Sequence, residues 1–420
     1  MKKLLIFAEY ALTVLCLLHY SGGPLAVLIS GGINEGEVQT AGGVDNSLVL
    51  ALFFLTYVLF FFLLVARWKK VIYVLSKDRF IWALFGLVVL SICWSVNPSK
   101  TITRIIALTG TTMFGLYLAT RYTMKEQLKL LTWMFGIAIM LSFVFAVALP
   151  KFGIMGGLHA GSWRGIYYHK NGLGLLMALS TIIFFIQVID ARKNRWIVWF
   201  GCSLSVILLL LSTAKSSLTN CIIVLAICLT CQILRWNYDW MIPGFTGVAT
   251  IAGSLYILLT TNLDTLLASI GKDTSLTGRT DIWPLVLNAI GKRPWQGYGF
   301  GAFWGEWNSE ASRIWNAAGW PVPNSHNGFL DVWLQLGILG LLLLALSFFA
   351  TLIRALLCIR HTTTSTWLWP LLYFSYIFLV SLGESTLMNQ NDLLWVLYVA
   401  IAYTLLLPIE EQVSHVNFKK

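Results

Sequence analysis

Long apolar stretches recur along the whole chain and decide which folds are open to it. A helix needs about 20 predominantly apolar residues to cross the roughly 30 Å hydrocarbon core of a bilayer. The composition, 58% hydrophobic and only 11% charged, lies outside the range of soluble domains. We therefore predict an all-α integral membrane protein, a single polytopic domain over 1–420 with about twelve transmembrane helices. The predicted spans are 4–29, 47–66, 80–97, 103–120, 130–149, 172–189, 196–212, 217–234, 240–260, 327–350, 366–383 and 393–408.

The first stretch begins MKKLLIF, as a signal peptide does. Its apolar run continues well beyond the usual length of such a peptide and has no clear cleavage site. We expect it to be an uncleaved first span.

The distribution of lysine and arginine predicts the orientation. With both termini in the cytoplasm, 18 of the 29 cationic residues fall in cytoplasmic segments, and the first outer segment, GGINEGEVQTAGGVDNS, has none. This agrees with the rule that cytoplasmic loops are enriched in positive charge. Residues 261–325 then form one long outer segment, which we expect to contain short helices. The eleven outward cations exceed what topology requires.

The net charge of +11 does not indicate nucleic-acid binding, because short cytoplasmic loops carry most of it. The seven cysteines lie in or beside predicted spans, so no disulfide framework is visible. Apart from Glu9 and His19, ionisable residues avoid the centres of the spans. Transporters usually place such residues at the bilayer midplane, so the pattern favours chemistry at the outer face.

Four outer stretches contain the polar residues of interest. WRGIYYHKNGLG (163–174) precedes the sixth span, where Asn171 is a candidate N-cap, and LLSTAKSSLTN (210–220) joins two spans. SLTGRTDIW (275–283) lies in the long outer segment, as does GYGFGAFWG (297–305), whose glycine spacing predicts aromatic turns rather than a nucleotide loop. A helix cap, a turn lysine near the lipid surface and an exposed ion pair are the structural alternatives. The candidate residues are Arg164, His169, Lys170, Lys215, Arg279 and Asp281.

The stretch NSHNGFLDVW (324–333), the fourth that contains candidate residues, immediately precedes the tenth span. We expect Asn324 or Ser325 to cap that helix, which would place His326 in its first turn. The helix dipole there disfavours protonation, and a neutral imidazole can accept a proton. Four residues separate Asn327 from Asp331, so they are expected to share a helix face and to form a hydrogen bond.

Together these stretches, with ESTLMNQNDLLWVLYVA near the C-terminus, resemble the bacterial O-antigen ligase and O-antigen polymerase superfamily, especially its exopolysaccharide-polymerase-like branch. The resemblance covers roughly residues 160–400. It implies an inner-membrane glycosyltransferase of the C-type architecture that transfers a glycan from undecaprenyl pyrophosphate on the periplasmic side, without a metal or other cofactor.

The resemblance also implies roles for the candidate residues. Arg279 would hold the pyrophosphate through its bidentate guanidinium, with Lys215 and Arg164 beside it. Lys215 stands where characterised ligases have Arg. His326 would be catalytic, by activating or orienting the acceptor, and His169, Lys170, Asn327, Asp281 and Glu384 would support it.

The nature of the acceptor stays open at this stage. A polymerase would extend a lipid-linked repeat unit of a surface polysaccharide, and a ligase would transfer O-antigen to lipid A core. Membrane lipids, a flippase and a chain-length regulator are the further partners that such a protein implies, and nucleic acid is not among them. A flippase or other transporter, and a metal-dependent transferase using Glu35 and Glu37, are the more distant alternatives.

We predict that a cysteine introduced at Ser309 is accessible from the periplasm, because the charge distribution places 261–325 outside. The Ser309→Cys variant should react with a membrane-impermeant maleimide in intact spheroplasts, above the background of the parent chain. Labelling that appears only after lysis would reverse the predicted orientation.

Overall fold

The computed structural model describes residues 2–32, 46–190, 195–231, 233, 239–244, 246–247, 250, 279–305, 307–362 and 364–408. These residues are helical apart from turns and one isolated antiparallel bridge between Ile154 and Trp163. The helices are α1 (Lys2–Tyr20), α2 (Leu25–Ile29), α3 (Ser47–Val65), α4 (Trp68–Lys77), α5 (Phe80–Leu90), η1 (Ser91–Trp94), α6 (Pro98–Arg121), α7 (Met124–Ala148), α8 (Pro150–Gly153), η2 (Gly157–His159), α9 (Lys170–Asp190), α10 (Arg195–Leu211), α11 (Lys215–Thr230), α14 (Arg279–Lys292), α15 (Ser309–Ala318), α16 (Gly328–His361), η5 (Ser365–Trp367), α17 (Leu368–Ser381) and α18 (Leu393–Thr404).

Six of the described helices are long and apolar enough to cross a membrane, namely α1, α3, α6, α7, α9 and α16. Five shorter apolar helical segments match further predicted spans. The prediction of a helical, multi-pass membrane protein is thereby confirmed. The full number of twelve spans stays a prediction, because most of 240–260 lies outside the described residues.

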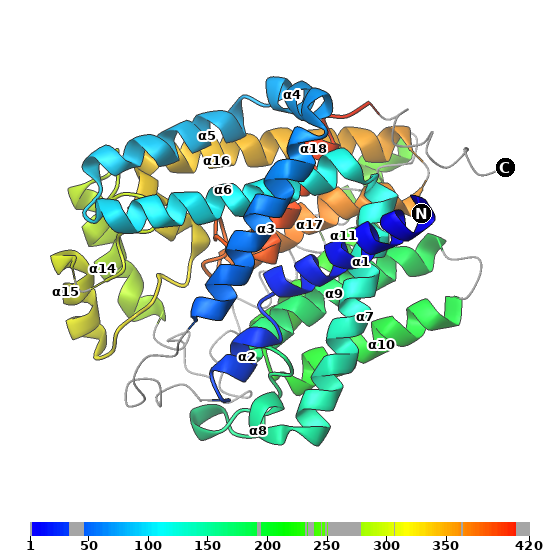
Figure 1. Cartoon of the computed structure of the whole chain (residues 1–420), viewed down its shortest axis with the longest axis horizontal. Helices are drawn as coiled ribbons and strands as arrows, with labels where there is room; N and C mark the ends of the chain where they lie inside the picture. The colour runs from blue at the N-terminus through cyan, green and yellow to red at the C-terminus, as the bar shows by residue number, and fades with distance from the viewer. Residues whose placement is uncertain are drawn as a thin grey trace.

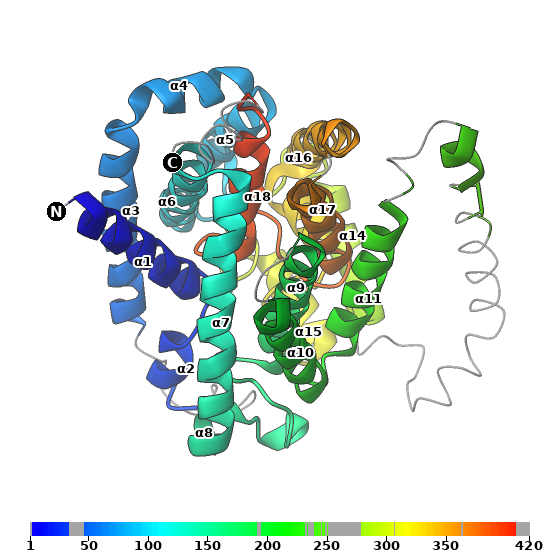
Figure 2. The same cartoon turned by 90° about the vertical axis from the view of Figure 1, so that its right-hand side faces the viewer.

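The helices run between two ends of the molecule. Figure 1 shows α14 and α15 at one end, on the left, and the beginning of α1 on the right. Seen from the side, α1 and α3 lie on one flank, α7 near the middle, and α9, α16 and α17 beyond it (Figure 2). Short connections let consecutive helices reverse direction. Helix α8, in the predicted outer segment after α7, lies at the bottom of Figure 1.

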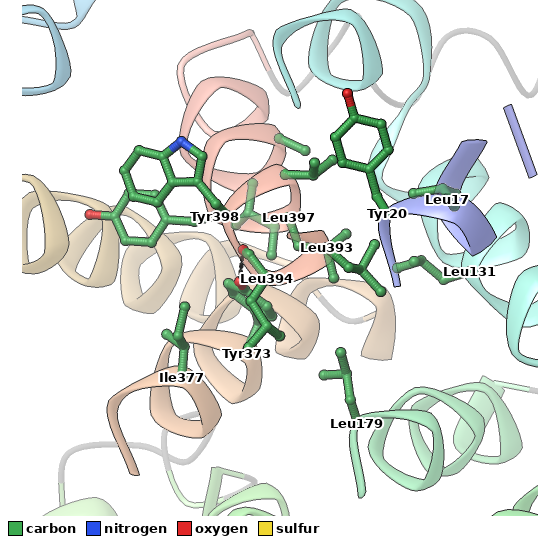
Figure 3. Close-up of a cluster of buried hydrophobic side chains, with 14 of the residues drawn as sticks. Leu17, Tyr20, Leu131, Leu179, Tyr373, Ile377, Leu393, Leu394, Leu397 and Tyr398 are labelled. Atoms are coloured by element: carbon green, nitrogen blue, oxygen red, sulfur yellow. Dashed lines mark hydrogen bonds between the residues drawn. The ribbon is translucent and has the colours of Figure 1, made fainter. Parts of the chain in front are cut away.

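The core centres on α18, the most fully buried helix of the described bundle, in which every residue from Leu393 to Thr404 is buried. It packs against α6, and the hydroxyl of Tyr373 in α17 donates a hydrogen bond to its Leu394 carbonyl. Figure 3 shows side chains from α1, α7, α9 and α17 packed around it: Leu17, Tyr20, Leu131, Leu179, Tyr373 and Ile377. A helix that is apolar on all sides can be buried in this way.

Two features differ from the predicted spans. The first span, expected to be one helix over 4–29, is interrupted between Tyr20 and Leu25, where Gly22 has a left-handed φ of 87° and Pro24 follows. The segment 67–79, predicted only as a basic cytoplasmic loop, contains the amphipathic helix α4. Hydropathy averaged over a span does not detect a single break, and a ten-residue helix is too short to register as a span.

Helix α16, predicted as a regular span over 327–350, extends from Gly328 to His361 and is kinked at Gly337. Gly337 has φ 68° and ψ −173°, a conformation that is essentially restricted to glycine. The loop after α14 packs against the kink: Tyr298 N donates to Leu334 O at 2.8 Å, and Ile338 N donates to Pro294 O at 2.8 Å. Non-helical backbone at membrane depth is tolerated where protein groups satisfy it in this way.

The kink yields a stability prediction. A Cβ atom on Gly337 would lie 2.0 Å from the carbonyl oxygen of Trp295, whereas one on Gly136, in α7, would meet nothing within 4 Å. Gly337→Ala should therefore lower the free energy of unfolding by about 3 kcal/mol or more, from backbone strain and this clash. Gly136→Ala is the matched control. Equal unfolding free energies of the two variants in mixed detergent micelles would contradict the assigned kink.

Candidate functional site at the outer end of the bundle

A cavity of about 430 Å³ opens at the end of the bundle that holds α14. Side chains from five separate segments line it, and the lining combines amides and hydroxyls with apolar groups. Its residues are Asn171, Gly172, Leu175, Ser216, Ser217, Asn220, Trp283, Asn324, Leu379, Val380, Leu382, Gly383, Glu384, Ser385 and Thr386.

Helix N-termini surround this cavity. Helix α9 begins at Lys170 and α11 at Lys215, and residues of their first turns, Asn171 and Ser216, line the cavity. Helix α14 begins at Arg279 and contributes Trp283 from its second turn. The first turn of a helix has unpaired N–H groups and partial positive charge. The cavity is therefore electrostatically suited to an anion.

The predicted position of His326 is wrong in one respect. Helix α16 is capped by Asn327, whose side chain accepts from Phe329 N and Leu330 N, and not by Asn324 or Ser325. His326 thus precedes the helix, with a left-handed φ of 53°. Its backbone N–H donates to Asn324 Oδ1 at 2.9 Å. Asn327 satisfies the helix end more directly because its side chain reaches two N–H groups at once.

Glu384 lines the cavity, and His326, which is not itself among the lining residues, lies beside this carboxylate. The Nδ1 atom of His326 lies 3.8 Å from Glu384 Oε2, which is too long for a hydrogen bond but close enough for an ion pair when the imidazole is protonated. Asn171 Nδ2 lies 3.5 Å from the other carboxylate oxygen, Oε1. The loop after α17 and the first turn of α9 are brought together here, although 213 residues separate them in the sequence.

Asp331 connects three segments of the site. Its buried carboxylate accepts from Ser325 N at 3.2 Å, from Trp304 Nε1 at 2.9 Å and from the hydroxyl of Ser385. The expected side-chain hydrogen bond with Asn327 is absent from these contacts, because the side chain of Asn327 is turned toward its own helix end. Asp331 thereby fixes the segment before α16 against the loop after α17.

Trp283 links helix α14 to the same segment. Its indole Nε1 donates to the carbonyl oxygen of Ser325 at 3.0 Å. We did not single out Trp283, Ser325 or Ser385 as site residues from the sequence. Trp283 lies inside the motif TGRTDIW, and Ser385 lies beside Glu384, so proximity to the chosen residues was the available signal.

The residues before α9 occupy a second part of the site. His169 caps the helix, because its Nδ1 accepts a hydrogen bond from Asn171 N at 3.1 Å. The sequence had favoured Asn171 as the cap, and this prediction is wrong. Lys170 Nζ donates to Thr213 Oγ1 at 3.4 Å. Thr213 has a left-handed φ of 54° and lies in the turn before Lys215. The stretches 163–174 and 210–220 are therefore neighbours, as the proposed common site requires.

Arg164 is placed differently from the expectation that it lines the cavity. Its side chain is fully buried, and its guanidinium donates to the carbonyl oxygens of Phe152, Gly32 and Lys151 at 2.7–2.9 Å. It is not among the cavity-lining residues. These contacts give Arg164 a structural function in holding the turn before α9.

The remaining predicted cations and their neighbours are less enclosed. Lys215 and Asp281 are exposed. Arg279 is described as the first residue of α14, but its side chain lies outside the described part of the structure. The position of its guanidinium therefore stays a prediction.

A smaller cavity of about 200 Å³ adjoins the first, since Asn324 and Ser385 line both. Arg104 from α6 is among its lining residues, together with Asp331 and Gln390. In the sequence, Arg104 is only one of the eleven cations predicted to lie outward. Its position on a long apolar helix, six residues after the first residue Pro98, was the signal that could have identified it.

Backbone strain is concentrated in these loops. Four non-glycine residues of the described chain have left-handed φ values: Thr213, His326, Met388 and Asn391. All four lie in connections at this end of the bundle. Such strain is retained where the surrounding structure fixes it, and it commonly occurs at functional sites.

The described residues contain no group of three or more His, Cys, Asp or Glu side chains that could hold a metal ion. Glu35 and Glu37, the residues of the metal-dependent alternative, lie outside the described part of the chain. The acidic residues around the cavity are engaged with amide, indole and hydroxyl donors instead.

Comparisons with known proteins show what this chain is similar to. Residues 169–345 match the family model described as O-antigen ligase. The chain is also 26% identical, over 317 residues, to the exopolysaccharide production protein ExoQ of Rhizobium meliloti (strain 1021), an alignment that covers 70% of each chain. Both findings confirm the resemblance that the sequence motifs indicate.

Asp331 provides a prediction about the integrity of the site. Asp331→Ala leaves three donors without their buried acceptor, each at a cost of about 1–3 kcal/mol. The free energy of unfolding should fall accordingly in a denaturation series in mixed micelles. Asp281→Ala, at an exposed position, should have an effect within about 0.5 kcal/mol of zero. An unchanged Asp331→Ala variant would show that these hydrogen bonds do not stabilise the site.

Proposed function

We propose that this chain, a membrane protein of the O-antigen ligase and polymerase superfamily, is a periplasmic-face glycosyltransferase. It would move a glycan from undecaprenyl pyrophosphate to an acceptor hydroxyl without a metal ion. The acceptor is most simply a second lipid-linked repeat unit, which would make the protein a polymerase of a surface polysaccharide. The resemblance to an exopolysaccharide production protein supports this choice over a ligase.

One observation carries the proposal. Helices α9, α11 and α14 begin with Lys170, Lys215 and Arg279, and other residues of the three helices line the same cavity: Asn171, Ser216 and Trp283. A cation at a helix N-terminus is unfavourable in isolation, because the dipole places positive charge there already. An arrangement of this kind is favourable when an anion occupies the cavity, and a pyrophosphate carries several charges.

The proposed reaction is a single displacement, in which different site residues would act on the acceptor and on the leaving group. The acceptor oxygen attacks the anomeric carbon, the bond from that carbon to the pyrophosphate oxygen breaks, and the lipid pyrophosphate leaves with the bonding electrons. A single displacement of this kind inverts the anomeric configuration. The cations and helix ends would stabilise the negative charge that develops on the leaving group.

His326 would take the proton of the acceptor hydroxyl. The carboxylate of Glu384, 3.8 Å from Nδ1, would stabilise the imidazolium that forms, and the Asn171 amide would hold Glu384 in position. Asp331, through Ser325 and Ser385, would keep His326 and Glu384 at this separation. Arg164 would contribute indirectly, by holding the turn before α9 rather than by contacting pyrophosphate.

His326→Ala should reduce the rate of transfer by roughly 10²–10⁴-fold, because it removes the proton acceptor. The free energy of unfolding should change little, because the Asn327 cap is retained. Glu384→Gln keeps the shape and the amide contact but loses the charge, so it should lower activity less than His326→Ala. The rates are measured on purified protein with and without EDTA. Full activity of His326→Ala, or EDTA inhibition reversed by Mg²⁺ or Mn²⁺, would contradict this assignment.

The identity of the acceptor is tested by reconstitution. Protein in liposomes is given one undecaprenyl-pyrophosphate-linked repeat unit and no lipopolysaccharide, without a flippase or chain-length regulator. A polymerase consumes the donor and forms a ladder of longer lipid-linked products. A single product that forms only when lipid A core is added would identify a ligase. No transfer to either acceptor, with folded protein, would refute the glycosyltransferase proposal.

A further inference from the structure

A separate cavity, of about 580 Å³, opens at the opposite end of the bundle from the candidate site. It is formed where α3 ends, α4 begins, and α6 is followed by α7. Under the predicted orientation this end faces the cytoplasm. The lining residues are Ala66, Arg67, Trp68, Lys69, Lys70, Thr120, Arg121 and Glu126.

Cations outnumber acidic groups around this cavity. Arg67 and Arg121 both bind Glu9 of α1: Arg121 donates to both carboxylate oxygens at 2.9 and 2.8 Å, and Arg67 donates to Oε1 at 3.0 Å. Glu126 accepts from the Thr123 N–H and hydroxyl in the cap of α7. Lys69 and Lys70 add two further positive charges to the lining. Four cations therefore face two carboxylates, both of which already accept several hydrogen bonds.

Helix α4, which supplies part of the lining, has the character of an interfacial helix. Its apolar residues Trp68 and Ile72 are each 56% exposed, whereas Val74 is fully buried. With ten residues it is far too short to cross a bilayer. Figures 1 and 2 show it lying across the ends of α3 and α5, at an angle to the long helices. Amphipathic helices with exposed Trp and adjacent Lys bind at the boundary between headgroups and acyl chains.

We propose that the cavity beside α4 binds the phosphate of an anionic phospholipid headgroup. The exposed Trp68 and Ile72 would enter the acyl region, while Lys69, Lys70 and the two arginines face the headgroup. Glu9 neutralises only part of the charge of Arg67 and Arg121, and an anionic headgroup would neutralise the remainder. This binding is independent of the glycosyl transfer proposed above.

The test compares lipid retention by two double variants. Full-length protein is extracted from nanodiscs that contain phosphatidylglycerol or phosphatidylcholine, and bound lipid is counted by native mass spectrometry. Lys69→Ala with Lys70→Ala should retain roughly tenfold less phosphatidylglycerol, since each basic residue near an anionic surface contributes several-fold to binding. Lys125→Ala with Lys129→Ala removes the same charge from exposed positions on α7 outside the cavity, and it should retain lipid as the parent chain does.

Thermal unfolding separates a lipid headgroup from a soluble phosphate. Phosphatidylglycerol should raise the unfolding midpoint of the parent chain and of the α7 control more than that of the α4 double variant. Inorganic phosphate added to phosphatidylcholine nanodiscs should not reproduce this shift. Equal lipid loss in both double variants, unchanged retention in the α4 variant, or full stabilisation by inorganic phosphate alone would each overturn the lipid assignment.

Discussion

The convergence of three helix N-termini on one cavity is the constraint on which this end of the molecule depends. Helices α9, α11 and α14 each begin with a cation and contribute side chains to one cavity. Their dipoles add to the charges of Lys170 and Lys215 instead of compensating them. Such an arrangement costs stability in the empty protein, and the apolar contacts of the bundle must offset it. The well-buried α18 and the helices around it supply those contacts away from the cavity.

The loops between the helices hold the site through buried polar contacts. Asp331 joins Ser325 to Ser385, and Trp283 binds the same serine through its carbonyl oxygen. Hydrogen bonds of this kind are strong in a medium of low dielectric constant and costly to leave incomplete. They explain how His326 and Met388 retain left-handed backbone conformations, because several partners fix each connecting segment at once.

Hydropathy and charge predicted the helical spans well, because the bilayer sets a common length for each of them. Helices α3, α10 and α11 begin at Ser47, Arg195 and Lys215, within about two residues of the predicted starts 47, 196 and 217. Helix α7 begins at Met124, before the predicted start at 130. Which of several neighbouring polar residues caps a helix was not predictable in the same way. Asn324, Ser325 and Asn327 are all good caps, and only the fold decides that Asn327 is used. The same limit applies to Asn171 and His169 before α9.

Some residues of the candidate site, such as His326 and Glu384, were predicted from sequence motifs, but the contacts between them were not. Arg164 binds three carbonyl groups, and Arg104 lines a cavity beside Asp331. Both placements depend on contacts between distant segments. A guanidinium can bind a phosphate or backbone carbonyls equally well by its chemistry. Burial distinguishes these uses, and burial of a particular side chain on a helix or turn is a property of the assembled bundle.

The kink at Gly337 has a mechanical consequence for a protein in a bilayer. It separates a short outer part of α16, next to His326 and containing Asp331, from the longer apolar part that ends at His361. Long transmembrane helices adjust to changes in bilayer thickness by tilting. The 294–299 loop is bonded to both parts: Tyr298 N and Gly299 N donate to Leu334 O and Gln335 O before the kink, and Ile338 N after it donates to Pro294 O. Gly337 thus lets the two parts of α16 follow different directions, while the loop holds them together at the kink.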